Sequence, residues 1–137
     1  MKALLVLGAL VAGTGATASA ANQYAQACLR NDVEAKRVSV WTNWGIGDRW
    51  HQVILGPGTS MVYRLTLDEA KPELTFNVRY HDRRGGEAVE QKLPSAWSEV
   101  PSADCAALPQ YKFVKAINER GEAIVTLVPV TGAEQGE

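Results

Sequence analysis

The octapeptide LTFNVRYH, residues 74–81, alternates apolar and polar residues along its whole length. Successive side chains of a β-strand point to opposite faces, so this alternation predicts a strand with one face packed on a core. The apolar face consists of Leu74, Phe76, Val78 and Tyr80. The polar face consists of Thr75, Asn77, Arg79 and His81.

Six further segments have the alternation or composition of strands. They are residues 37–44, 50–55, 61–67, 88–93, 111–117 and 123–128. Glycine-containing turns separate several of them, including GPG at 56–58 and DRRGG at 82–86. About seven short antiparallel strands predict an all-β fold, either a single small β-sandwich or a partly open barrel.

Two segments have the composition of short helices instead. NQYAQACL at 22–29 combines helix-tolerant residues with an asparagine at the N-cap position, and it predicts about two helical turns. SADCAAL at 102–108 predicts one further turn. Neither segment is long enough to determine the fold.

The first twenty residues have the pattern of a secretory signal peptide. Lys2 precedes an apolar stretch at 3–12, and Ala18, Ser19 and Ala20 form an A-x-A cleavage site. The apolar stretch is far shorter than the roughly 20 residues that a membrane-spanning helix needs. We therefore expect cleavage after Ala20, export to the periplasm or the medium, and no membrane span afterwards. Residues 21–130 are expected to form the β-sandwich domain, and 131–137, TGAEQGE, a disordered tail.

The charge balance argues against a nucleic-acid partner. The chain has 14 basic and 15 acidic side chains, and Lys2 is removed with the signal peptide. Such a composition provides no basic surface for nucleic acid or anionic lipid. No glycine loop for phosphates and no nucleophile-elbow pattern occurs in the sequence, so we expect no cofactor.

The two cysteines, Cys28 and Cys105, belong to no C-x-x-C pair, which gives little support to a zinc site or a redox motif. In an oxidising compartment they predict one structural disulfide. This bond ties the start of the domain to the segment before its last hairpin.

Three of the four tryptophans lie in WTNWGIGDRWH, residues 41–51. If 45–48 is the loop of a hairpin, Thr42 faces His51, Trp41 faces Gln52 and Val40 faces Val53. The more aliphatic face, expected on the core, carries Val38, Val40, Thr42, His51, Val53 and Leu55. The outer face carries Ser39, Trp41, Asn43, Trp50, Gln52 and Ile54.

In this register Trp41 and Trp50 are diagonal neighbours within reach of each other. With Asn43 and Gln52 as a polar rim, they form a candidate binding site for a sugar ring or a partner protein. The alternative is that a second layer covers both rings as part of the core, and a one-residue slip of register sends them inward.

The remaining chemistry in the sequence is sparse. His51 and His81 are the only histidines, and both are expected to be surface or hydrogen-bonded residues, neither metal ligands nor catalytic bases. The run DRR at 82–84 is expected to be a solvated turn, or else a small cationic tip for an acidic group. The sequence favours an exported, non-catalytic binding or interaction module of the bacterial envelope or secretome. The alternatives are a carbohydrate-binding module, an envelope enzyme inhibitor and, less favoured, a small hydrolase, with a protein or a polysaccharide as partner.

Overall fold

The computed structural model describes residues 21–47 and 49–131. The expected signal peptide, and the expected tail beyond Thr131, lie outside these residues. The strands are β2 (Gln23–Asn31), β3 (Val38–Asn43), β4 (His51–Leu55), β5 (Ser60–Leu67), β6 (Thr75–His81), β7 (Ala88–Pro94), β8 (Trp97–Ser98), β9 (Gln110–Ile117) and β10 (Ala123–Pro129). A single 3-10 turn, η2 (Cys105–Ala107), lies between β8 and β9, where the sequence predicts one helical turn.

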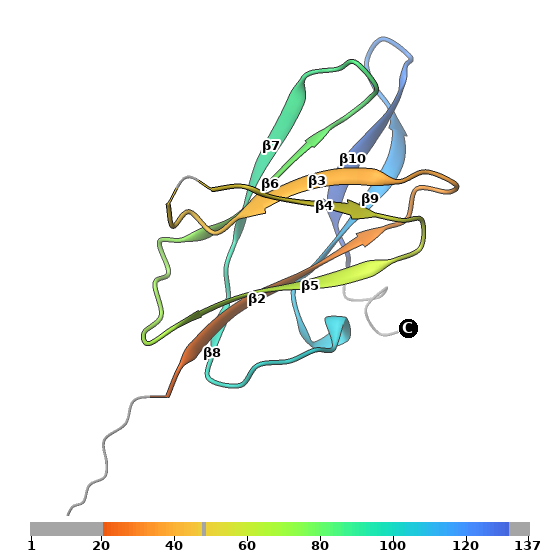
Figure 1. Ribbon diagram of the computed structural model, residues 1–137. Coiled ribbons are helices and arrows are strands. Elements are labelled where there is room, and N and C mark those ends of the chain that lie inside the picture. Colours follow the sequence, from red (N-terminus) through yellow and green to blue (C-terminus); the bar gives the residue numbers. More distant parts are fainter. Residues whose placement is uncertain (1–20, 48, 132–137) are drawn as a thin grey trace, which may run out of the picture.

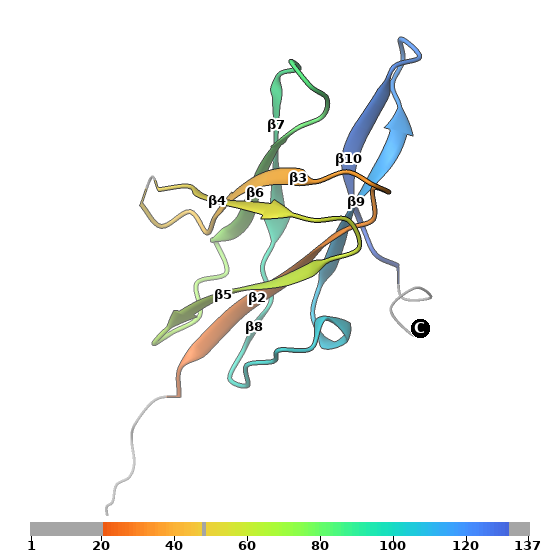
Figure 2. The same cartoon turned by 45° about the vertical axis from the view of Figure 1, so that its right-hand side comes forward.

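These strands form two sheets that pack face to face (Figure 1). One sheet has the order β10-β9-β2-β5, with the short β8 also paired to β2, and the other has the order β4-β3-β6-β7. Both views place the β6–β7 and β9–β10 turns at the same end of the molecule (Figure 2). The protein is therefore an all-β sandwich, as the alternation predicts.

The core lies between the sheets and is built on the strand that the alternation at 74–81 predicts. Phe76, Val78 and Tyr80 are almost completely buried, whereas His81 on the opposite face is exposed. Tyr80 meets Phe113 of the other sheet edge-on, with ring centroids 5.1 Å apart. Burial of such side chains is the main stabilising contribution to a domain of this size.

The hydroxyl of Tyr80 also joins the two sheets by hydrogen bonds. The backbone N–H of Leu127 in β10 donates to it over 3.2 Å, and Gln91 Nε2 in β7 donates over 3.0 Å. A buried tyrosine normally finds such partners, because an unpaired hydroxyl in the core is costly. Tyr80 thus supplies both apolar area and a polar connection between the layers.

The helix predicted at 22–29 is wrong, because these residues form β2. This strand pairs along eight residues with β5 and, on its other side, with β8 and β9. Five consecutive residues, from Ala25 to Leu29, are buried, so both faces of the strand are covered. A strand buried on both faces lacks the apolar–polar alternation by which strands are recognised. The β2–β9 pair is also parallel, although the sequence predicts only antiparallel strands.

The segment before β9 covers the side of β2 that points away from the core. The predicted disulfide fastens the segment to this strand. Cys28 and Cys105 are bonded, with their Cα atoms 5.6 Å apart. Next to this bond, Gln26 Nε2 donates to the carbonyl of Ser102 over 2.6 Å, and the N–H of Ser102 donates back to Gln26 Oε1 over 2.9 Å. One side-chain amide therefore satisfies both backbone groups of a residue far away in the sequence.

Candidate binding face

The hairpin of β3 and β4 has the register that the sequence predicts. Val40 pairs with Val53, Trp41 with Gln52 and Thr42 with His51. The core face is buried at Val38, Val40, Thr42 and Leu55, and Val53 packs against the core. The exception is His51, which is exposed at the start of the edge strand β4, where the other sheet does not cover it.

The three tryptophans of this hairpin divide between core and surface. Trp44 packs on the core, with its ring centroid 4.7 Å from that of Phe76. Trp41 and Trp50 are only partly buried and do not belong to the core cluster. They lie on the opposite face of the sheet β4-β3-β6-β7, which we call the outer face. Trp41 and Trp50 therefore lie on the face that the predicted register gives them, and Trp44, for which no position is predicted, packs on the core.

A row of side chains crosses all four strands of the outer face. Backbone pairing aligns Gln52 of β4 with Trp41 of β3, Trp41 with Arg79 of β6, and Arg79 with Glu90 of β7. Arg79 Nη2 lies 3.1 Å from Glu90 Oε1. Residues directly opposite on neighbouring strands are in contact distance, so this register determines which side chains surround Trp41.

The two partly exposed indoles each contact a side chain of β6, Trp50 that of Arg79 and Trp41 that of His81. The guanidinium carbon of Arg79 lies 4.2 Å from the centroid of the Trp50 ring, a cation–π contact that passes over β3. Trp41 instead meets the edge of His81, with ring centroids 5.8 Å apart. Among the described residues, no ring contact joins Trp41 to Trp50. The outer face is therefore an aromatic and cationic surface in which Trp50 is already covered by Arg79.

Of the predicted rim residues, Asn43 has a structural role and Gln52 is exposed. Asn43 Oδ1 accepts hydrogen bonds from Asn77 Nδ2, over 2.7 Å, and from the backbone N–H of Gly45, over 3.1 Å. These bonds hold the end of the β3–β4 turn against β6. Gln52 lies beside Trp41 with its side chain in solvent.

An open depression of about 540 Å³ lies next to Trp41, at the end of the outer face where β6 turns into β7. We call it the Trp41 depression. Its lining residues are Arg37, Ser39, Trp41, His81, Arg83, Arg84, Gly85 and Gly86. A neighbouring hollow of about 230 Å³ shares four of these residues and adds Lys36, Val38 and Val125. The volume of the depression is in the range of known ligand sites.

The turn that forms one wall of the depression favours glycine at residue 86. A Cβ at Gly86 would lie 2.7 Å from Asp82 Oδ1 and 2.8 Å from Arg83 Cγ, so both side chains would have to shift. The carbonyl of Gly86 lies 2.9 Å from His81 Nδ1, which fixes the imidazole beside Trp41. The tight turn therefore positions both His81 and the two arginines that follow Asp82.

The arginines of the depression differ in their ion pairs. Arg83 Nη1 lies 3.3 Å from Oε1 of Glu122, the residue before β10. The hydrogen bond from Asn118, together with the charges of Arg83 and Arg120, holds the pKa of the Glu122 carboxyl below its ordinary value. Glu122 is thus a stable anionic partner for Arg83. Arg37 and Arg84 have no ion-pair partner within the part of the chain that the structure describes.

Arg79, Arg37, Arg84 and His81 are missing from the site that the sequence predicts. The alternation at 74–81 assigns Arg79 and His81 to a polar face, but it contains no information that β6 pairs with β3. Arg84 belongs to the predicted cationic tip, and its proximity to Arg37 depends on the same pairing. Long-range pairing of this kind is not visible in local sequence patterns.

In the ranges 21–47 and 49–131, no three His, Cys, Asp or Glu side chains are grouped so that they could hold a metal ion. No helix in those ranges is long and apolar enough to cross a membrane.

The fold and the outer face together define a small, disulfide-linked β-sandwich with an aromatic and cationic surface on one sheet. No protein-family model matches the chain. No curated protein and no solved structure is significantly similar to it either. Its function is therefore inferred from the residues of the outer face.

Proposed function

We propose that this domain is a non-catalytic binding module that recognises a saccharide on its outer face, with Trp41 as the stacking platform. The observation that favours this function is the partly exposed Trp41 ring beside an open depression of about 540 Å³. An indole offers an apolar face to the C–H groups of a sugar ring. Ser39, Gln52 and His81 surround it with groups able to bond sugar hydroxyls.

A protein partner, including an enzyme to be inhibited, is the competing class. A stable protein interface typically buries about 800 Å² on each side around a desolvated apolar centre. The outer face of the sandwich has one strongly exposed aliphatic side chain, Ile54, among charged and polar neighbours. This composition suits a ligand rich in hydroxyl groups better than an apolar protein surface.

Replacement of Trp41 by alanine tests the proposal. The wild type is screened by calorimetry against a panel of soluble neutral and acidic polysaccharides, and the ligand found is then titrated into the variant. We expect Trp41→Ala to weaken binding at least roughly tenfold, as for other aromatic anchors. The melting temperature is expected to stay within a few degrees, because the ring lies outside the core.

Ile54→Ala is the matched control, because Ile54 lies on the same face and is 58% exposed. A saccharide bound at Trp41 leaves this variant unaffected, whereas a protein bound across the whole face loses an apolar contact. Failure of every polysaccharide to bind the wild type, or equal binding by Trp41→Ala, contradicts the proposed function.

We further propose that the protein is exported to the periplasm or secreted. The leader pattern at 1–20 and the Cys28–Cys105 disulfide both support this, because disulfides persist mainly in oxidising compartments. Protein recovered from the exported fraction is expected to begin at Ala21, which intact-mass measurement determines. A mass that retains residues 1–20 contradicts export by this leader.

A further inference from the structure

We infer that the Trp41 depression is an anion subsite in which Arg37 and Arg84 bind a carboxylate, so that the saccharide recognised is an acidic one, such as a polyuronate. This inference rests on the proposed function, because it specifies the ligand class for the same face. It follows from the charges that line the depression, from their partners and from the presence of the Trp41 ring in the same lining.

The lining has a strong excess of positive charge, so the expectation of no basic surface, drawn from the overall charge balance, does not hold at this depression. The depression and the hollow beside it are lined by Lys36, Arg37, Arg83 and Arg84, and by no Asp or Glu. The whole chain has 14 basic and 15 acidic side chains. Charges of one sign gathered in a concave site attract a ligand of the opposite sign.

Two acidic residues close to the depression have cationic neighbours. Glu122 binds Arg83 and Arg120, at 3.3 Å and 3.2 Å. Asp82 faces a separate, smaller hollow that is also lined by Lys36 and Lys115. Neither carboxylate lines the Trp41 depression, so the charges of Arg37 and Arg84 are available to a ligand.

The chemistry of the two arginines suits a carboxylate next to a sugar ring. A guanidinium presents several N–H groups in one plane, which match the two oxygens of a carboxylate. Trp41 lines the same depression, and therefore a uronate ring stacked on the indole can direct its carboxylate toward Arg37 and Arg84. Hydroxyl groups of the same ring meet Ser39 and His81, which line the depression as well. A neutral saccharide keeps the ring contact and the hydroxyl contacts but lacks the carboxylate that binds Arg37 and Arg84.

The test compares oligogalacturonate with its fully methyl-esterified form, which has the same rings without charges. We expect the acid to bind at least roughly tenfold more tightly than the ester. Arg37→Gln and Arg84→Gln are expected to remove this preference, because they lower the affinity for the acid to that for the ester. Lys92→Gln is the control, because Lys92 is an exposed cation on β7 that does not line the depression.

Each outcome separates the two proposals. Equal, Trp41-dependent binding of acid and ester overturns the anion subsite and leaves the saccharide function intact. If Lys92→Gln lowers the affinity for the acid as much as Arg84→Gln does, the attraction is a general charge effect and the proposed subsite is wrong. Poly-L-glutamate serves as a third probe, and its binding in preference to oligogalacturonate identifies an acidic peptide as the ligand and overturns both proposals. Lack of binding by acid and ester alike also overturns both. Melting temperatures confirm that each variant is folded.

Discussion

Simultaneous replacement of Cys28 and Cys105 by alanine is expected to lower the free energy of unfolding by about 4–5 kcal/mol, because the disulfide closes a loop of 77 residues. In the chain-entropy description, a cross-link stabilises by restricting the unfolded chain, and its effect increases with the logarithm of the loop length. Few stabilising interactions in a domain of this size are worth as much.

The surroundings of the bond determine what remains after its removal. The N–H of Cys28 donates to the carbonyl of Pro109 over 2.9 Å, and the paired hydrogen bonds of Gln26 and Ser102 lie close by. The segment before β9 therefore keeps part of its attachment to β2, and the native fold is expected to persist in the variant with lower stability.

Urea denaturation of the double variant and of the chemically reduced wild type measures this loss. Both are expected to lose a similar amount, and reductant is expected to leave the double variant unchanged. A loss below about 1 kcal/mol contradicts an entropic role for this bond.

The sequence predicts those parts of the fold that depend on local patterns. Alternation defines β6, and the glycine turns together with two unequal faces define the register of the β3–β4 hairpin. The strand β2 is not predicted, because the segment that covers its side away from the core comes from far along the chain. Without that segment Gln26 and Cys28 would face water, and buried and exposed residues would alternate along the strand. With the segment in place, five consecutive residues are buried.

The same distinction applies to the candidate site. Trp41 and Trp50 are placed on the outer face by the hairpin alone, so their position follows from neighbouring residues. Their contacts do not, because Arg79 and His81 reach them through the pairing of β3 with β6. The guanidinium of Arg79, which the hairpin alone does not place, is the ring neighbour of Trp50.

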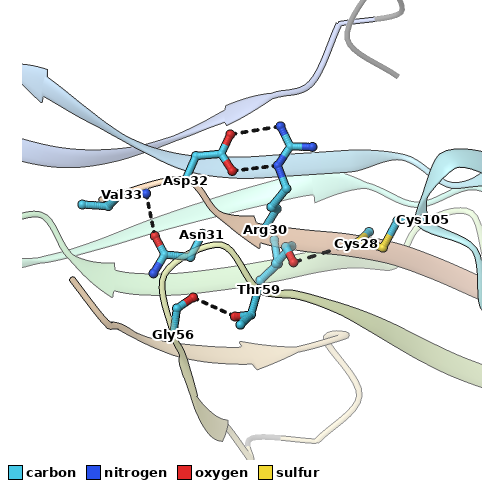
Figure 3. A network of polar contacts seen from close by, with 9 residues as sticks. Cys28, Arg30, Asn31, Asp32, Val33, Gly56, Thr59 and Cys105 are labelled. Carbon is cyan, nitrogen blue, oxygen red and sulfur yellow. Dashed lines mark hydrogen bonds and ion pairs between the residues drawn. A yellow bond between two sulfur atoms is a disulfide. The ribbon is translucent and has the colours of Figure 1, made fainter. Parts of the chain in front are cut away.

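Asn31→Ala is the second substitution with a large expected effect. It is expected to lower the free energy of unfolding by about 3–5 kcal/mol. Asn31 is completely buried at the end of β2. Its Nδ2 donates to the carbonyls of Lys36 and Leu55 over 2.8 Å and 3.0 Å. Its Oδ1 accepts from the N–H of Val33 over 2.8 Å, the bond drawn in Figure 3. Alanine leaves three backbone groups without this partner, and each such buried group costs about 1–3 kcal/mol.

The amide of Asn31 also holds the loop between β2 and β3 in an unfavourable conformation. Ala35 has a φ of 61°, in the left-handed region that residues other than glycine rarely adopt. Such a residue costs about 1–3 kcal/mol and persists only where its surroundings impose the conformation. Because Asn31 bonds to Val33 and Lys36 on either side of Ala35, its loss allows the loop to relax.

Two further variants isolate the part played by the amide. Asn31→Asp keeps an acceptor for Val33 but places a carboxylate against two carbonyls, so it is expected to destabilise at least as much as alanine. Asp32→Ala removes the neighbouring ion pair with Arg30, 2.8 Å long and partly exposed, and is expected to cost less than about 1 kcal/mol. If Asn31→Ala is as mild as Asp32→Ala in urea denaturation, the hydrogen bonds of Asn31 do not hold the loop.

The position of this loop connects stability to the proposed site. Asn31 bonds to the carbonyl of Lys36, and the next residue, Arg37, lines the Trp41 depression. Relaxation of the loop is therefore expected to displace Arg37, while Trp41, within β3, stays in place. Asn31→Ala is accordingly expected to lower the affinity for oligogalacturonate while the affinity for its methyl ester stays the same, at temperatures where the variant is still folded. Equal losses for both ligands would show that the variant disturbs the whole outer face and not the loop alone.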